Sequence, residues 1–448
     1  MTTPRPPARI THEALYLSED GLAALEAPID GPRAPIAAVA SQPARPVKQD
    51  RIGALRLRDF RFLFIGTVTS GYGQWATMIG LGWLAYVLSG ESAAQLAWVV
   101  AVGGAMRLVS APWIGVVLDR YHRRSVTVWS TLASAVLGLG LGVLVITDLV
   151  AFWQLYVFSA LEGIISSANQ NVRQTFVYDV TTPDTLSNAI ALNAIAQNLS
   201  RISGPPLAGA MIGLLGTASP FLFIAVMMTI ATFFTLLISK TTRQAALDTD
   251  NPLHSLWVGL RYVATDRPML GLFLSGAVPG IFLYPYIPLL PVFAEEVLGT
   301  GSTGYGLLAA SVGWGSLTGL LVLSWLGDVR HKGIIAIWGL VFYAAALIVF
   351  TQSTVFVLSS AMLVVAGIFH GVAFTVAQIL VQVLARDEMR GRATSLFQMG
   401  FSLMPVGAIP MGLAIEAWGA ATAVGGFITV AFVWFVFMGF FWRSLLRA

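Results

Sequence analysis

The chain has 448 residues, of which 56% are hydrophobic and only 11% are charged, with a formal net charge of +4 and a mean hydropathy of +0.76. A soluble domain usually carries about 25% charged residues, so this chain has too few polar side chains for a water-facing surface, and we expect lipid to be its solvent. The absence of cysteine excludes a disulfide framework and cysteine-ligated metals.

Residues 1–53 are rich in Ala and Pro and show no sustained apolar face, so we expect them to form a disordered cytosolic tail. The opening stretch MTTPRPPARITHEALYLSED lacks the apolar core of a cleavable signal peptide.

Repeated apolar segments follow the tail, and each is long enough to cross a bilayer as a helix of about 20 residues. They predict twelve transmembrane helices at approximately 60–89, 93–118, 125–147, 152–177, 187–214, 219–239, 268–296, 302–327, 333–351, 354–384, 392–415 and 420–442.

Nearly all Lys and Arg residues that follow the tail lie in alternate loops. The loops after the first, third, fifth, seventh, ninth and eleventh helices hold none, whereas the other side holds Arg51, Arg56, Arg58, Arg61, Arg120, Arg123, Arg124, Lys240, Arg243, Arg261, Arg267, Arg330, Lys332, Arg386, Arg390, Arg392, Arg443 and Arg447. This asymmetry predicts that both termini are cytosolic, in a bacterial cytoplasmic (inner) membrane. It also explains the basic character of the chain without a nucleic-acid partner, because cationic loops lie beside anionic lipid.

The segment 241–267 separates two sets of six helices, at 54–240 and 268–448, and its stretch NPLHSLWVGLRYVATDRP is typical of an amphipathic surface helix. The halves resemble each other, since LDRYHRR after the second helix corresponds to LGDVRHK after the eighth, and the glycines of helix 5 correspond to Gly407 and Gly412 of helix 11. Internal duplication at this scale is typical of secondary transporters.

The loop GVVLDRYHRR, residues 115–124, places an acid among arginines between two apolar helices. A carboxylate there could cap a helix or pair with an arginine, and so hold the cytosolic ends of the two halves together. The alternative is a simple cationic loop with an incidental acid. The predicted gating residues are Gly115, Asp119, Arg120, Arg123 and Arg124, with Asp328 as the counterpart in the second half.

This loop resembles the motif of the major facilitator superfamily, although His122 replaces its usual glycine and Ser324 makes the second copy degenerate. The stretches RLRDFRFLFIG, TLSNAIALNAIAQNLSRISGPPLAG, WVGLRYVATDRPML and MRGRATSLFQMGFSLMPVGAI are similar to its branch of enterobactin and drug exporters. The resemblance covers residues 54–445. It implies an all-α membrane protein with twelve transmembrane helices in two pseudo-symmetric six-helix bundles.

The same resemblance implies further site residues. ISGPPLAG in helix 5 is similar to the antiporter motif of the superfamily, at Gly204, Pro205 and Gly209, and a tight helix crossing is the alternative. The cavity-facing helices of the superfamily contribute Gln74, Trp75, Tyr284, Tyr286, His370 and Gln378. His370 could carry a proton or could be a hydrogen-bonded packing residue. The prolines of helix 7 would interrupt its hydrogen bonding.

Three charged residues fall near the middle of the membrane. Arg107 lies about 18 Å along the helix from Asp119, Glu162 is ten residues into helix 4, and Arg201 is deep in helix 5. Because isolated charges at this depth are costly, we expect Glu162 to pair with Arg107 or Arg201 in one polar cluster. That cluster could be a structural ion pair, or it could form a positive cavity suited to anions.

The sequence lacks the motifs of other mechanisms. None of its three lysines follows a glycine as in a nucleotide-binding GxxxxGK[ST] loop, HExxH and GxSxG are absent, and the five histidines are scattered. We therefore expect neither an enzyme nor a cofactor or metal site, but a monomeric transporter that exports a small organic molecule, siderophore-like or otherwise anionic, in exchange for protons. The alternatives are multidrug efflux of hydrophobic or cationic compounds, an importer or symporter, and a non-transporting sensor.

Overall fold

The computed structural model describes residues 53–239, 252–327 and 331–442. Nearly all of the predicted tail, part of the linker and Asp328 therefore lie outside the described residues, as do the side chains of Asp119 and Arg120.

The first half begins with a short turn, η2 (Gly53–Arg56), and then consists of long helices. They are α2 (Arg58–Leu88), α3 (Ala93–Arg120), α4 (Arg123–Ile146), α5 (Phe152–Asp179), α6 (Pro183–Leu215) and α7 (Ser219–Leu236). The amphipathic helix expected before the second half is present as α8 (Pro252–Thr265).

The second half contains both continuous and interrupted helices. Its continuous helices are α11 (Gly301–Leu326), α12 (Lys332–Gln352), α13 (Phe356–Leu384) and α16 (Ala420–Phe441). One interrupted segment comprises α9 (Arg267–Val278), η3 (Pro279–Leu283), η4 (Tyr284–Tyr286), α10 (Leu290–Val292) and η5 (Phe293–Val297). The other comprises α14 (Arg390–Met399), η7 (Gly400–Leu403) and α15 (Met404–Trp418), after the turn η6 (Asp387–Met389).

Local sequence explains where the helices start and break. Ser92 caps α3 by accepting a hydrogen bond from the backbone N–H of Gln95 at 3.2 Å, and Asp266 caps α9 through the N–H of Met269 at 3.2 Å. The regular α9 ends at Val278 because proline follows, and the chain continues through a π turn and a 3₁₀ turn around Pro285. The interruption expected from these prolines is therefore present, and it presents Tyr284 and Tyr286 from irregular backbone.

The twelve spanning segments predicted from the sequence are present, and the all-α fold is confirmed. Nine helices in the described part of the chain are long and apolar enough to cross a membrane. The other three segments, α2, α5 and α6, are 31, 28 and 33 residues long but carry more polar and charged residues.

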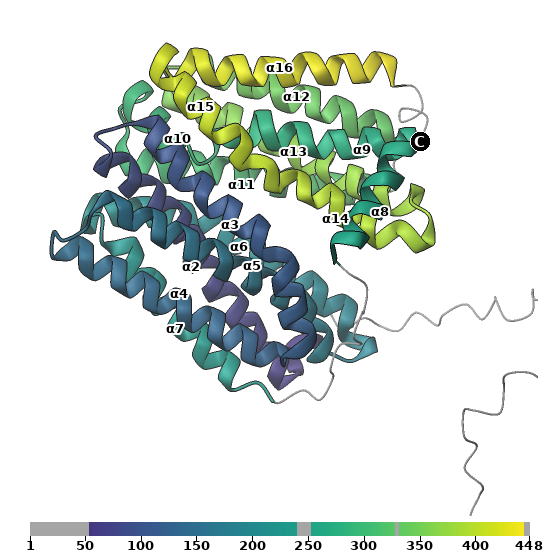
Figure 1. Cartoon of the computed structure of the whole chain (residues 1–448), viewed down its shortest axis with the longest axis horizontal. Coiled ribbons are helices and arrows are strands. Elements are labelled where there is room, and N and C mark those ends of the chain that lie inside the picture. Colours follow the sequence, from purple (N-terminus) through teal and green to yellow (C-terminus); the bar gives the residue numbers. More distant parts are fainter. Residues whose placement is uncertain (1–52, 240–251, 328–330, 443–448) are drawn as a thin grey trace, which may run out of the picture. The chain divides into compact units, whose positions relative to one another are not determined.

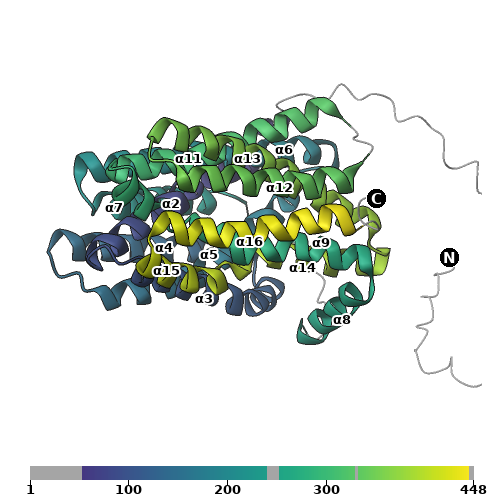
Figure 2. The same ribbon diagram turned by 90° about the horizontal axis from the view of Figure 1, so that it is seen from above.

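Helices α2 to α7 pack together, and so do α9 to α16 (Figure 1). The main contacts between the halves are made by α6 with α11 and by α3 with α15. Figure 2 shows α3 and α15 side by side. Residues of α6 and α3 therefore reach the boundary between the halves, where the interrupted segment of the second half also lies.

Candidate transport site

An aromatic cluster with one histidine lies in the second half. The Nε2 atom of His370, on α13, lies 3.1 Å from the hydroxyl oxygen of Tyr284, within hydrogen-bond distance. The Tyr284 ring meets the imidazole edge-on with centroids 5.3 Å apart, and the Tyr343 ring of α12 lies 5.2 Å away. Two predicted residues, Tyr284 and His370, are thus brought together, and the histidine has a hydrogen-bonding neighbour.

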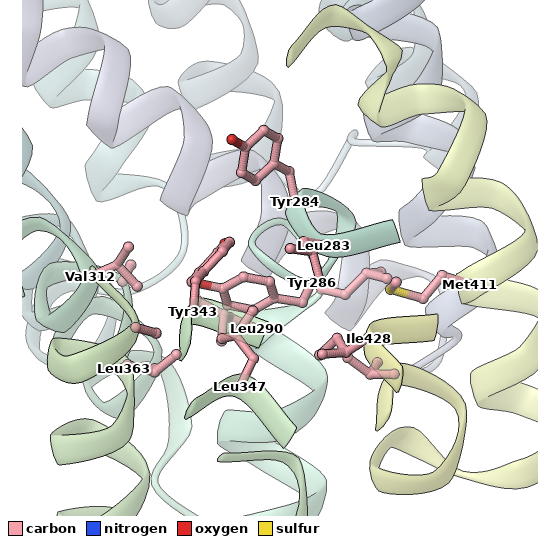
Figure 3. Packing of buried hydrophobic residues seen from close by; sticks show 14 of the residues in the cluster. Leu283, Tyr284, Tyr286, Leu290, Val312, Tyr343, Leu347, Leu363, Met411 and Ile428 are labelled. Carbon is pink, nitrogen blue, oxygen red and sulfur yellow. The ribbon is translucent and has the colours of Figure 1, made fainter. Parts of the chain in front are cut away.

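Tyr286 lies deeper than Tyr284. Figure 3 shows its ring beside Tyr343 among Leu283, Leu290 and Leu347, while the Tyr284 ring points away from these leucines. Tyr286 is completely buried, and its ring also contacts that of Phe350, with centroids 6.2 Å apart. Tyr286 therefore supports the wall of the cluster, whereas Tyr284 presents its hydroxyl to His370.

Arg201 is the cation that faces this cluster from the first half. It lies on α6, and its charge acts electrostatically on Tyr284, Tyr286, Tyr343 and His370. The backbone carbonyl of Arg201 also lies close to Gly313 of α11, which places this part of α6 against the second half. One guanidinium, three phenols and an imidazole therefore act on one another electrostatically near the boundary between the halves.

The Glu162 side chain points toward α4 and not toward the aromatic cluster that Arg201 faces. Its carboxylate is 7% exposed and accepts hydrogen bonds from the Ser134 hydroxyl of α4, with Oγ 3.1 Å from Oε1 and 3.0 Å from Oε2. Arg107 of α3 is the cation whose charge reaches this carboxylate, and its own side chain is exposed.

The expected ion pair is not formed. Within the described residues, neither Arg107 nor Arg201 lies within 4.0 Å of a carboxylate oxygen, and the hydrogen-bonding partner of Glu162 is Ser134. The reason is the close crossing of α3 and α5, where Gly163 packs on the backbone of Gly103. Glu162 precedes Gly163 and lies about 100° away from it around the helix, so its side chain is directed toward α4. The three charges form two separate groups and not one cluster.

The other predicted cavity residues are less connected. Trp75 packs against Gly204, where an added Cβ atom would lie 2.8 Å from the Cβ atom of the tryptophan. Gln74 and Gln378 are half-buried, and neither side chain takes part in a hydrogen bond in the parts of the chain that the structure describes. They stay predictions from the resemblance alone.

The antiporter-like motif, Gly204, Pro205 and Gly209, lies on α6 at a close helix crossing. A Cβ atom on Gly209 would lie 2.5 Å from the Ser302 carbonyl oxygen and 3.0 Å from the Gly306 Cα atom, and Gly306 packs in turn on the Pro205 carbonyl. Only glycine allows α6 and α11 to approach this closely. The motif therefore has a packing role across the boundary between the halves.

The loop after α3 is tied to the first half by its arginines. Arg123 donates from Nη1 to Asp179 Oδ1 at 2.7 Å and to the Thr175 carbonyl at 3.2 Å, and Arg124 donates to the Leu236 carbonyl at the end of α7. Gly115 was expected to permit a close helix approach, but no atom of the described residues lies within 4 Å of the position of its missing Cβ atom in this conformation. That part of the expectation is wrong for this state.

Four functional candidates were missed by sequence reasoning. Ser134, Tyr343 and Asp179 gave no signal, because each acquires its meaning only from its partner on another helix. Arg173 could have been noticed, since it is a charge inside the predicted fourth helix. It is 6% exposed, and its Nε donates to Asn169 Oδ1 at 2.5 Å.

Three hydrogen bonds to two glutamates join the halves at the end where α2 finishes and α3 begins. The Tyr86 hydroxyl donates to Glu296 Oε1 at 2.9 Å. Glu416, near the end of α15, accepts from the Ser92 hydroxyl and from the Ala94 backbone N–H, the latter at 3.3 Å. Both acceptors come from the second half and all donors from the first, so these contacts hold this end closed.

A family model described as "Transmembrane secretion effector" matches residues 51–441. The chain is 22% identical to the staphyloferrin A transporter of Staphylococcus aureus, over 80% of this chain and 90% of that protein. It is also 28% identical to the class B tetracycline resistance protein of Escherichia coli, over 35% of this chain and 38% of that protein.

Solved structures share the fold. A bacterial homologue of the human lysosomal transporter Spinster, inward-facing and unoccupied, matches with a TM-score of 0.69 at 14% identity, over 86% of this chain and 96% of that chain. The nucleoside transporter NupG matches with a TM-score of 0.66 at 15% identity, over 87% of this chain and 99% of that chain.

Proposed function

Because the chain belongs to the transmembrane secretion effector family of the major facilitator superfamily, and is therefore a multi-pass membrane transporter and not an enzyme, we propose that it exports a small organic anion in exchange for protons. The substrate class that we favour is a siderophore-like or other carboxylate-bearing compound. The similarity to a staphyloferrin A transporter supports this class.

The observation that carries the proposal is the position of Arg201. A guanidinium at this depth needs compensation, yet within the described residues no carboxylate lies within 4.0 Å of it. It faces the Tyr284 and His370 pair across the boundary between the halves. A substrate carboxylate bound there would accept hydrogen bonds from the guanidinium and contact both halves at once, which is what alternating access requires of a substrate site.

Proton coupling is assigned to the other group. Glu162 lies in the first half with Ser134 as its partner and Arg107 as its electrostatic neighbour. The sequence predicted Glu162 in one polar cluster with Arg107 and Arg201. With two separate groups, the coupling instead acts through the first half, because protonation changes whether Glu162 is attracted to Arg107 and so biases the helices that carry both sites.

Orientation and surroundings complete the proposal. The distribution of basic loops supports cytosolic termini in a bacterial inner membrane and a membrane-lipid environment. We propose that the transporter acts as a monomer. With that orientation, the end closed by Glu296 and Glu416 faces away from the cytosol. The substrate site would then be open toward the cytosol in this conformation, ready to load an exported compound.

Multidrug efflux is the second candidate. The partial similarity to a tetracycline resistance protein and the aromatic rings around His370 favour it. In that case Arg201 would pack and not bind, and uncharged or cationic compounds would be transported equally well.

Transport into proteoliposomes tests the proposal. Purified protein would be reconstituted, a pH gradient imposed without ATP, and uptake measured for a fluorescent carboxylate, its uncharged methyl ester, staphyloferrin A and tetracycline. We expect gradient-driven transport of the carboxylate in preference to its ester. Arg201→Ala should raise the KM of the carboxylate by about 10- to 100-fold, because a hydrogen bond to a charged group contributes about 1.5–3 kcal/mol, with little effect on the ester.

The outcomes separate the alternatives. Equal transport of acid and ester, or preferential transport of tetracycline, would favour multidrug efflux. Transport that persists after the gradient is collapsed would exclude proton coupling. Transport in the same direction as the protons would indicate a symporter, and no transport of any probe with normal folding would favour a sensor.

A further inference from the structure

Two arginines of the first half lie at the same depth on different helices. Arg107 lies 14 residues after Ala93, the first residue of α3, and Arg201 lies 14 residues before Leu215, the last residue of α6. Both of these helix ends are on the side of the molecule that Glu296 and Glu416 hold closed, because successive helices alternate in direction. At a rise of about 1.5 Å per residue, both arginines are about 21 Å from that side.

Arg107 projects between a helix of each half. The missing Cβ atom of Gly103 would meet Ser159 of α5, and that of Gly104 would meet Pro405 of α15. Arg107 follows these glycines by four and three residues, so it lies about 40° from the first and about 60° from the second around α3. Its exposed side chain is therefore directed between α5 of the first half and α15 of the second.

Arg201 has the equivalent position on α6. Gly204 faces Trp75 of α2, and Gly209 faces Ser302 of α11. Arg201 lies about 60° from Gly204 and about 80° from Gly209 around the helix, again between the two faces. Its half-buried side chain is therefore directed between α2 of the first half and α11 of the second.

Both guanidinium groups are available to an anion. Within the described residues, neither lies within 4.0 Å of a carboxylate oxygen, and the Glu162 carboxylate near Arg107 is held by Ser134 of α4. A charged side chain that is accessible at this depth faces a water-filled space and not lipid. Two separate cations thus reach one level of the space between the halves, each beside a different pair of helices.

We propose that the substrate carries at least two carboxylates, one bound by Arg201 and the other by Arg107. This inference rests on the proposed function, in which Arg201 binds a substrate carboxylate, and it makes Arg107 a second substrate-binding residue. Each guanidinium can bind one carboxylate through paired hydrogen bonds. A substrate held in this way contacts the α6–α11 boundary and the α3–α15 boundary at once, and these are the two boundaries that must rearrange during alternating access.

Equilibrium binding to the full-length protein in lipid nanodiscs tests the inference without transport. The probes are the linear dicarboxylates from succinate to sebacate, each compared with its own monomethyl ester by isothermal titration calorimetry. Because the arginines are fixed on two helices, we expect the affinity of the diacids to pass through a maximum at one chain length. At that length the diacid should bind about 10- to 100-fold more tightly than its ester, since it forms a second hydrogen-bonded contact with a charged group.

Variants assign the second contact. Arg107→Ala should reduce the affinity of the diacid to that of the ester and leave the ester nearly unaffected, whereas Arg201→Ala should weaken both. Arg107→Lys keeps the charge and should retain part of the preference for the diacid. Arg261→Ala is the matched control, because it removes the same charge from an exposed position on α8, and it should leave the preference unchanged.

Several results would overturn the inference. Equal affinity of diacid and ester at every length in the wild-type protein would show that no second carboxylate is bound. Equal weakening of diacid and ester in Arg107→Ala, or the same loss in Arg261→Ala, would show that Arg107 acts only through the general electrostatic field.

The fate of the proposed function is separable from these results. If the diacid preference depends on Arg107 but vesicles show no transport driven by a pH gradient, proton exchange fails while recognition by two arginines stands. If monocarboxylates are transported in exchange for protons and Arg107→Ala changes no affinity, the inference fails and the proposed function stands.

Discussion

The polar contacts at the closed end predict how easily that end opens. Glu416→Ala removes the acceptor of the Ser92 hydroxyl and of the Ala94 N–H, and Tyr86→Phe removes the donor to Glu296 while keeping the ring. Hydrogen bonds to charged groups contribute about 1.5–3 kcal/mol when shielded. Both acceptors, Glu296 and Glu416, are exposed. Competition from water therefore reduces the stabilising free energy of each contact to about 0.5–1 kcal/mol.

The expected change in population follows from these values. Each substitution should raise the population open at this end about two- to fivefold, and the double variant should raise it by about the product, since the two contacts share no residue. Glu295→Ala is the matched control, because this exposed glutamate lies next to Glu296 and its side chain takes part in no hydrogen bond in the described part of the chain.

The absence of native cysteine makes the measurement simple. Ser302 is 7% exposed where α11 meets α6, so Ser302→Cys places a nearly isosteric thiol inside the closed end. Labelling by a membrane-impermeant maleimide should accelerate in proportion to the open population. Equal labelling rates in the wild-type background, Glu416→Ala and the double variant would refute the assignment of these contacts to a gate.

Three further predictions concern coupling, gating and packing. Glu162→Gln should abolish the dependence of transport on an imposed pH gradient while exchange of substrate down its own gradient continues; a retained dependence in proteoliposomes would assign the proton to another group. Asp119→Asn, predicted from the loop motif, should reduce transport strongly at near-normal expression, and normal rates in vesicles would remove its gating role. Gly209→Val should slow transport at least tenfold because its Cβ atom would lie 2.5 Å from the Ser302 carbonyl, whereas Gly140→Val, with no atom within 4 Å, should transport normally; equal rates in the two valine variants would show that the crossing need not close.

The sequence alone was sufficient for the membrane architecture. Apolar segments of spanning length must be helices, because backbone groups in lipid can be satisfied only within a helix or a closed barrel. The interruption near Tyr284 was also predictable, since proline at 279 cannot continue the hydrogen-bond ladder. The charges at mid-depth, Arg107, Glu162 and Arg201, could be selected because their cost in lipid is independent of their neighbours.

Which groups these charges face was decided by the tertiary structure. Lipid tails and packed leucines are equally apolar, so the sequence of a membrane helix gives little indication of the face that meets a neighbouring helix. The prediction of one cluster failed for this reason. The crossing at Gly163 directs Glu162 to Ser134, and the packing of α6 on α11 brings Arg201 to the tyrosines of the second half. Both depend on rotations of a helix about its own axis, which only the contacts with other helices fix.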